Sequence, residues 1–289
     1  MPEKYVPPRK DTYVLDPEDT AEMTRLMLQD RMITKGMGGI FSEYGNHLPA
    51  GITRVLDVGC GPGGWVLDVA YAHPQVKVTG LDISHTMITY ARARAKAEGR
   101  RNAEFAEGNI LEPLAFPDNY FGLVNARFMI MFLQRYAWPV AVRELYRITA
   151  PGGIIRLTEC DTMGSSNSPS LQKILGWFYL ALHRSGYGFS PDGRDCGMTP
   201  VLGKLLADAG CVKIQVRPYA LDFSHGTEFF QTQYENYMIG LQLAKPLFVK
   251  TGVASEEEFT LAYDKMIAEM LDKNFRAYWH LFTAWGYKP

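Results

Sequence analysis

Apolar residues follow two different periods in the first half of the chain. Between Arg54 and Glu159, short apolar runs alternate with segments in which apolar residues recur at helical spacing. The runs read RVLDVG, KVTGLD, AEFAEGN, FGLVNA and GIIRLTE, and the helical segments read WVLDVAYAH, TMITYARARAKAEG and AVRELYRIT. Such alternation is typical of βαβ units with right-handed crossovers. The pattern predicts a doubly wound, Rossmann-like α/β core with a mostly parallel sheet of seven strands.

Helical patterns also occur where this core does not require them. Apolar residues near helical spacing after an Asp-Pro pair predict a helix from about 16 to 40, after an extended arm over 1–16, and a second short helix near 39–48. Further helices are expected at 171–185, 199–209, 227–250 and 255–273, the last opened by SEEEF, a serine cap with an acidic first turn. Strands are expected at 212–217 and in the aromatic FRAYWHLFTAWGYKP.

These patterns predict one core with three helical additions. Residues 1–50 form an N-terminal arm or lid, and residues 51–289 hold the core. Insertions at about 161–198 and 226–273 are expected to lie over the carboxyl ends of the strands. A chain of 289 residues could form two domains, but α/β folds of this size often close around one core.

A glycine-rich turn follows the first strand. Gly59, Gly61 and Gly64 match the G-x-G-x-x-G pattern of dinucleotide sites, and Gly59, Gly61 and Gly63 would let backbone pass close beneath a ligand. Asp82 ends the second strand, where a carboxylate can accept both hydroxyls of a ribose. A nicotinamide enzyme and an enzyme with an adenosyl ligand would both use this pair.

The longer pattern distinguishes between them. VLDVGCGPGGW is followed in order by LDISHTMITYARARA, EGNILEPLAFPDNYFGLV and VRELYRITAPGGIIRLTE. This succession resembles the class I S-adenosylmethionine-dependent methyltransferases, in particular the ubiquinone- and menaquinone-biosynthesis-like branch. The resemblance covers about Arg54 to Glu159 and implies S-adenosylmethionine as the cofactor and a small-molecule acceptor. It also implies cofactor contacts at Asp57, Gly59, Cys60, Gly61, Gly63, Asp82, Ile83, Ser84, Met87, Asn109, Ile110, Asn125 and Arg127.

The chemistry of several of these residues leaves alternatives open. Asp57 can bond loop amides or the ligand's ammonium group, or serve the structure alone. Ile83 and Met87 would give the adenine an apolar face, or belong to the core. Ser84 could cap the helix that starts beside it. Cys60 is interpreted as small loop filler, because no histidine is near it in sequence to activate the thiol.

Two polar residues at later strand ends extend this interpretation. Asn109 stands where the family more often has an acidic residue, and its amide could accept from the adenine amino group and donate to a ring nitrogen. Ile110 would follow with a backbone amide and an apolar contact to the ring. Arg127, embedded in apolar sequence beside Asn125, could pair with the ligand carboxylate, or be a surface arginine.

A catalytic base is needed only if the acceptor must lose a proton. Sulfonium methyl transfer is an in-line displacement that requires alignment and exclusion of water, and no metal is expected. Candidate bases are Tyr13, Glu159, His183 and His225. Aromatic residues of the helical additions suit a flat or hydrophobic acceptor, although about half of them are expected to be packing core. They are Trp177, Phe178, Tyr179, Tyr187, Phe189, Phe229, Phe230, Tyr234 and Tyr237.

Composition narrows the remaining classes. Thirty basic and thirty-one acidic residues give a net charge of −1 without a basic run, and NARFMIMF lacks the Asn-Pro-Pro-aromatic motif, so nucleic acid is not the expected partner. The four cysteines show no metal spacing and are expected as reduced thiols in the cytoplasm. The first residues carry charge and proline but no apolar run, so neither export nor a membrane span is expected. A homodimer is compatible with it.

Two other activities are considered beside methyl transfer. A nicotinamide oxidoreductase would need a second constellation such as Tyr-x-x-x-Lys, which is not evident in the sequence. A relative that keeps the adenosyl ligand but catalyses a cyclisation or isomerisation would carry the same cofactor motifs. A non-catalytic binding protein is least compatible with an intact ligand loop. The mass of the product distinguishes methyl transfer from cyclisation or isomerisation, because a methyl transfer adds one methylene and an isomerisation adds nothing.

Overall fold

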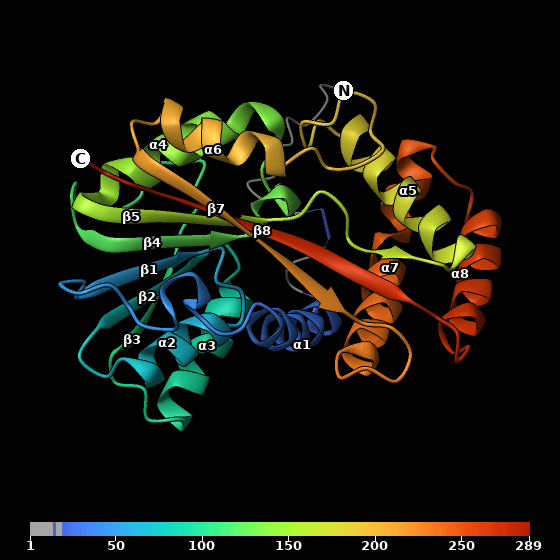
Figure 1. The fold of residues 1–289 in the computed structure, drawn as a ribbon, viewed down its shortest axis with the longest axis horizontal. Helices are drawn as coiled ribbons and strands as arrows, with labels where there is room; N and C mark the ends of the chain where they lie inside the picture. The colour runs from blue at the N-terminus through green and yellow to red at the C-terminus, as the bar shows by residue number, and fades with distance from the viewer. Residues whose placement is uncertain (1–13, 16–18) are drawn as a thin grey trace, which may run out of the picture.

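One twisted sheet organises the molecule (Figure 1). The computed structural model describes residues 14–15 and 19–289. The strand order is β3-β2-β1-β4-β5-β8-β6, and β7 pairs with β8. The strands are β1 (Arg54–Val58), β2 (Lys77–Asp82), β3 (Ala103–Glu107), β4 (Phe121–Arg127), β5 (Thr149–Glu159), β6 (Ser165–Ser166), β7 (Val212–Asp222) and β8 (Ala277–Tyr287).

The sheet confirms the predicted fold class. Strands β1 to β5 pair in parallel, whereas β8 runs antiparallel to β5, β6 and β7. The eighth strand, β6, has only two residues and was not expected from the sequence. Strand β1 lies between β2 and β4, so the strand order reverses there. In such sheets the crevice outside the carboxyl ends at this point is the usual ligand site.

Helices cover both faces of the sheet and extend past one end of it. They are α1 (Thr20–Gly36), α2 (Gly64–Ala72), α3 (His85–Ala97), α4 (Trp138–Ile148), α5 (Pro169–Arg184), α6 (Thr199–Asp208), α7 (Phe230–Thr251) and α8 (Glu256–Met270). In Figure 1, α2 and α3 lie on one side of the sheet and α4 and α6 on the other, while α5, α7 and α8 gather at the right. Three short 3-10 helices complete the list, η1 (Ser42–Tyr44), η2 (Met129–Met131) and η3 (Arg135–Ala137).

Most of the expected helices form close to their expected bounds. The short helix expected near 39–48 is limited to the single turn η1, and α7 begins at Phe230, three residues later than expected. Ser84 caps α3, because its hydroxyl accepts a hydrogen bond from the Met87 amide at 3.1 Å. Ser255 and Glu258 form a reciprocal capping box on α8. The arm expected over 1–16 lies almost wholly outside the described residues.

The helical additions share their core with the sheet. Alternate residues of each parallel strand face opposite sides, so Val55 packs with α2 whereas Leu56 packs toward α4. The cluster that contains Leu56 continues without a break into Phe178 of α5 and Phe248 of α7. These helices are therefore held to the sheet by burial of apolar surface, the main source of folding stability.

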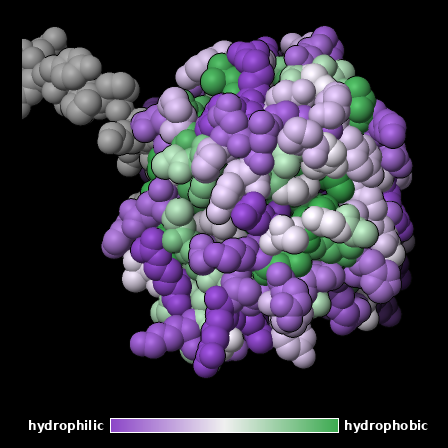
Figure 2. Space-filling model, turned by 90° about the vertical axis from the view of Figure 1, so that its left-hand side faces the viewer, coloured by the Kyte–Doolittle hydropathy of each residue, from purple (hydrophilic) through white to green (hydrophobic). Residues whose placement is uncertain are grey.

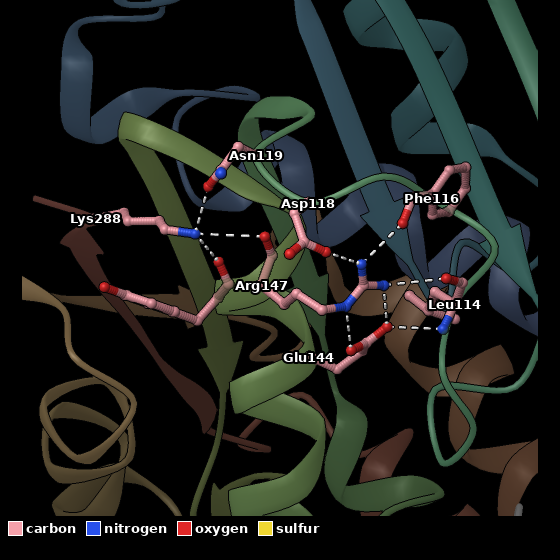
Figure 3. A network of polar contacts seen from close by, with 8 residues as sticks. Leu114, Phe116, Asp118, Asn119, Glu144, Arg147 and Lys288 are labelled. Atoms are coloured by element: carbon pink, nitrogen blue, oxygen red, sulfur yellow. Dashed lines mark hydrogen bonds and ion pairs between the residues drawn. The ribbon is translucent and has the colours of Figure 1, made fainter.

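A polar network fixes the segment between β3 and β4 to helix α4 (Figure 3). The Arg147 guanidinium donates to the carbonyls of Leu114 and Phe116 at 3.1 and 3.0 Å. It also pairs with Glu144, which accepts from the Leu114 amide at 2.7 Å, and with Asp118. The pairing with Arg147 lowers the pKa of Glu144. The network holds the far end of a segment that begins at the ligand crevice.

The surface is mainly polar on the face drawn in Figure 2, and the four cysteines are not paired in disulfides. Figure 2 shows the face at the left of Figure 1, where polar side chains cover most of the area and apolar ones form smaller groups. No helix among residues 14–15 and 19–289 is both long and apolar enough to cross a membrane. All four cysteines are unpaired and buried, at Cys60, Cys160, Cys196 and Cys211.

Candidate active site

One cavity of about 200 Å³ opens at the carboxyl ends of the parallel strands. Its wall joins the loops after β1, β2, β3 and β4 to residues of α1, α5, α7 and β8. The strand-end loops contribute Asp57, Gly59, Cys60, Gly61, Asp82, Ile83, Asn109 and Arg127, among others. The helices and β8 contribute Arg25, Asp30, Phe178, Gln233, Asn236, Tyr237 and Trp279, among others. Segments far apart in the sequence thus form a single wall.

The turn after β1 has left-handed backbone at alternate positions. Gly59, Gly61 and Gly63 have φ angles of 69°, 51° and 79°, a region that residues with a Cβ rarely occupy. The amides of Gly59 and Cys60 both donate to the Leu81 carbonyl, at 2.8 and 3.0 Å. The turn is therefore held tightly against the end of β2, and its backbone lines the floor of the cavity.

Asp82 connects the glycine turn with the start of α3. Its Oδ2 accepts from the Gly61 amide at 2.8 Å, and its Oδ1 accepts from the Ser84 amide at 2.9 Å. Each carboxylate oxygen can accept more than one hydrogen bond, so both can also serve a ligand. On the next loop, the Asn109 Oδ1 accepts from the Leu111 amide at 3.0 Å and closes a turn beside the cavity.

Asp57 lies at the inner end of a buried polar series. Its Oδ1 accepts from the Asn125 amide at 2.7 Å, and Asn125 in turn accepts from Arg156 at 2.6 Å. Arg156 pairs with Glu43, and both side chains are almost completely buried, at 1% and 0% exposure. Burial raises the pKa of Asp57 to about 7, although the positive charge of Arg127 and the Asn125 hydrogen bond oppose this rise.

Arg127 at the end of β4 meets a carboxylate of helix α1. Its guanidinium pairs with the Asp30 Oδ1 and donates to the Thr34 hydroxyl at 3.2 Å. The other oxygen, Asp30 Oδ2, is buried and has no hydrogen-bond partner among the described residues. A Cβ added at Gly64 would lie 1.9 Å from this oxygen, so the start of α2 must be bare for Asp30 to reach it. Asp30 was not expected at the site from its sequence context.

Known proteins match the part of the chain that carries the strand-end loops of the cavity. The Methyltransferase domain family model matches residues 55–153. Demethylmenaquinone methyltransferase of Geobacillus stearothermophilus is 29% identical over 181 residues, which are 57% of this chain and 74% of that protein. The chain is a class I S-adenosylmethionine-dependent methyltransferase. The resemblance found in the sequence, to the menaquinone- and ubiquinone-biosynthesis-like branch, is confirmed.

Two further comparisons extend beyond the matched domain. The protein named "Probable methyltransferase ltbC" of Aspergillus luteorubrus is 28% identical to this chain over 246 residues. The match covers 80% of this chain and 85% of that protein. YcgJ of Bacillus subtilis shares the fold, with a TM-score of 0.53 at 18% identity, covering 86% and 98% of the two chains. Phosphoethanolamine N-methyltransferase 2 of Haemonchus contortus gives a TM-score of 0.52 at 19% identity, covering 88% and 53%.

Ten of the thirteen residues expected at the cofactor line the cavity, namely Asp57, Gly59, Cys60, Gly61, Asp82, Ile83, Met87, Asn109, Ile110 and Arg127. The lining of the described cavity does not include Gly63, Ser84 or Asn125. Gly63 serves packing, because a Cβ there would lie 2.6 Å from the Phe105 ring. Burial raises the pKa of the Cys60 thiol well above its usual range, which suits loop filler and not a nucleophile.

The structure keeps the described candidate bases away from the cavity wall. Glu159 is buried and is not among the described lining residues, and its Oε1 accepts from the Met129 amide at 2.6 Å, which fixes the turn η2. Burial raises the pKa of Glu159 well above its usual range. His183 lies on α5, and the His225 ring packs on Phe230 with centroids 5.0 Å apart; neither is among the described lining residues. Tyr13 lies outside the described residues.

The apolar part of the cavity wall comes largely from outside the motif region. Its lining includes Leu15, Ile33, Phe128, Met131, Phe132, Met163, Leu175, Phe178, Tyr237, Leu241 and Trp279. Polar Arg25, Gln233 and Asn236 interrupt this wall. These three residues were not expected at the site, and the i, i+3 spacing of Gln233 and Asn236 in a long helix was the only signal for them in the sequence. A polar pair at that spacing is ordinarily assigned to a solvated face.

Proposed function

We propose that the enzyme methylates a small, ring-bearing hydrophobic metabolite inside this cavity. The observation that carries the proposal is continuity: a polar end built on strand-end loops opens directly into an apolar chamber lined by aromatic side chains. A ring compound would bury its surface there, at roughly 25 cal/mol per Å² of apolar area. The Geobacillus relative is named for a demethylated menaquinone, a ring compound, which is consistent with such an acceptor.

The residues present fit S-adenosylmethionine at the polar end. We assign the ribose hydroxyls to Asp82 and an apolar adenine contact to Ile83 and Ile110, with the bare backbone of Gly59 and Gly61 beneath the ligand. When bound, the cofactor supplies the methyl group on its sulfonium. Asn109 would face the adenine edge, as expected from its place after β3.

The Arg127–Asp30 ion pair fits the amino-acid end of the cofactor. Arg127 offers positive charge to a carboxylate, and Asp30 Oδ2 is a buried acceptor that still lacks a donor among the described residues. An ammonium group would satisfy that oxygen with a charge-assisted hydrogen bond. Opposite charges side by side match a zwitterion, and Asp57 adds a second carboxylate nearby. This assignment places helix α1 in the cofactor site as well as over it.

The helical additions act as the acceptor's enclosure in this proposal. Residues up to 50 and the segments 161–198 and 226–273 supply most of the apolar wall, so they would orient the acceptor and exclude water. Alignment and desolvation are the principal demands of an in-line displacement. None of the described candidate bases is on this wall, so we propose transfer without a base from Glu159, His183 or His225.

Incubation with methyl-labelled S-adenosylmethionine and a panel of phenols, naphthols and hydroquinones tests the proposal. We expect label in a ring compound whose mass has gained one methylene. A product isomeric with its substrate, with cofactor unconsumed, would instead support the cyclisation or isomerisation alternative. Transfer only to polar acyclic amines would contradict the aromatic acceptor.

A further inference from the structure

A chain of buried polar groups crosses the apolar chamber wall from α1 to α7. Glu22 and Arg25 form a doubly hydrogen-bonded ion pair at 2.6 Å, and both side chains are buried. The Arg25 Nη1 donates to the Asn236 Oδ1 at 2.7 Å. The Asn236 Nδ2 then donates to the Gln233 Oε1 at 3.0 Å. The hydrogen-bonded chain thus ends at the buried amide of Gln233, a residue of the cavity wall.

The direction of this chain follows from its arginine. A guanidinium has five N–H donors and no acceptor, so Asn236 must turn its oxygen toward Arg25. Its amide N–H2 then points to Gln233, which must present its own oxygen in return. The Gln233 Nε2 is therefore fixed as the outer end. Amide orientation is ordinarily ambiguous from shape alone, but here the charge at the start of the chain decides it.

The Gln233 Nε2 is a buried donor without a hydrogen-bond partner among the described residues. Its side chain is 1% exposed. The nearby Tyr237 hydroxyl donates to the Met163 carbonyl at 2.7 Å, and burial raises the pKa of Tyr237 while the Gln233 amide opposes that rise. An amide nitrogen carries two N–H groups, so contact with one hydroxyl leaves the second available. A buried donor left unpaired is costly, which makes it a marker for a ligand.

We propose that Gln233 is a specificity-determining residue whose amide N–H donates a hydrogen bond to an oxygen of the acceptor molecule. The inference rests on the proposed function and deepens it: the acceptor is a ring compound that carries a carbonyl or a comparable hydrogen-bond-accepting oxygen. The charges of Glu22 and Arg25 cancel, so the site selects a neutral oxygen over a carboxylate. Arg25 and Asn236 are positioning residues, because they act through Gln233.

Binding of two matched rings to the protein saturated with S-adenosylhomocysteine tests this without any turnover. The probes are α-tetralone, which has a ketone oxygen, and tetralin, which lacks it; calorimetry gives their dissociation constants. We expect Gln233→Met to lower the tetralone-to-tetralin affinity ratio about tenfold relative to the unsubstituted protein. The matched control is Gln231→Met, an exposed glutamine on the same helix, which should leave the ratio unchanged.

A second substitution guards against a folding defect. Gln233→Glu keeps an oxygen for the Asn236 amide but removes the amide N–H donor, so the folded variant with an ionised carboxylate should also lower the ratio; circular dichroism verifies that the variant is folded. A ratio that is the same in all variants would overturn the assignment of Gln233 alone. If neither ring binds the unsubstituted protein, the apolar chamber itself is wrong as an acceptor site, and this inference falls with the proposed function.

A variant that reverses the hydrogen bond between positions 236 and 233 gives the most specific test. In Asn236→Asp, the new carboxylate accepts from Arg25 and cannot donate to Gln233. The Gln233 amide should then rotate, donate to that carboxylate and turn its oxygen to the cavity. We expect the ratio of α-tetralol to α-tetralone affinity to rise about tenfold, because only the alcohol can donate. An unchanged ratio in a folded Asn236→Asp protein would contradict the directed chain.

Discussion

The two ends of the cavity are supported by similar series of side chains that finish in opposite groups. At the cofactor end, Glu43 and Arg156 orient Asn125, whose N–H reaches Asp57, and the series finishes in a carboxylate. At the acceptor end, Glu22 and Arg25 orient Asn236, and the series finishes in the Gln233 N–H. In both, an arginine that can only donate gives the asparagine behind it one orientation.

The same arrangement, a Glu–Arg ion pair that orients an asparagine, thus supports two kinds of site. A carboxylate at the end suits a cationic ligand, whereas an amide N–H at the end suits a neutral oxygen. The cofactor series runs through adjacent strands, β1, β4 and β5, which the sheet registers hold together. The acceptor series joins residues 211 positions apart through the packing of α1 on α7. A Cβ at Gly240 would lie 3.1 Å from the Arg25 Cδ, so a bare position on α7 permits that approach.

Substitution of each arginine should affect only its own series of side chains. The largest loss in the free energy of unfolding is expected for Arg156. Arg156→Met leaves Glu43 buried and uncompensated, and the free energy of unfolding should fall by about 3–5 kcal/mol in urea titrations. Arg25 is itself part of the cavity wall, so Arg25→Met should cost less, about 1–3 kcal/mol. Cofactor affinity should fall in the first variant and survive in the second. Arg143→Met, at an exposed position of α4, is the control.

Asp82→Ala should weaken the cofactor end alone. It removes the acceptor of the Gly61 and Ser84 amides and of the proposed ribose hydroxyls, so cofactor affinity should fall by about 1–3 kcal/mol. Tetralone binding to the cofactor-free protein should not change. Calorimetry with both ligands measures this. Equal losses for the two ligands would mean that the ends of the cavity are not separable.

Arg147→Met tests the support outside the cavity. The substitution frees two backbone carbonyls of the segment between β3 and β4 and leaves Glu144 with only the Leu114 amide as a donor (Figure 3). Because Arg147 is partly exposed, we expect a loss of about 1–2 kcal/mol in the free energy of unfolding. Hydrogen exchange should rise in residues 108–120. Unchanged exchange there would indicate that the segment is held from the cavity side.

Asp57 should make cofactor binding depend on pH. Its pKa in the free protein is about 7, and a cationic ligand favours the carboxylate, so binding below that pH releases a proton. Affinity for S-adenosylmethionine should therefore rise by about tenfold between roughly pH 6 and pH 8 and level off above. Asp57→Asn should flatten this part of the profile, while the titration of the ligand's own amine remains in both proteins. The same slope in both would assign the dependence to the ligand.

Local pattern was sufficient for the sheet and the floor of the cavity. Strand period, glycine spacing and the carboxylate after β2 are properties of neighbouring residues, and parallel strands bring their carboxyl ends together by topology alone. The positions of Asp57, Gly59, Gly61, Asp82 and Arg127 at the cavity could therefore be expected from sequence. Gly63 could not be distinguished from its neighbours, because its role depends on the Phe105 ring from β3.

Only the tertiary structure decided the rest of the wall. Asp30, Arg25 and Gln233 lie on helices whose sequences read as ordinary polar faces, and a polar residue on a helix is usually solvated. Arg25 and Gln233 became buried because α1 packs on α7, whereas Asp30 meets Arg127 because α1 also packs on α2. The sequence by itself therefore determined the fold class and the proposed place of the cofactor, since both follow from local period and spacing. Which polar groups line the proposed acceptor chamber depended on how separate helices pack.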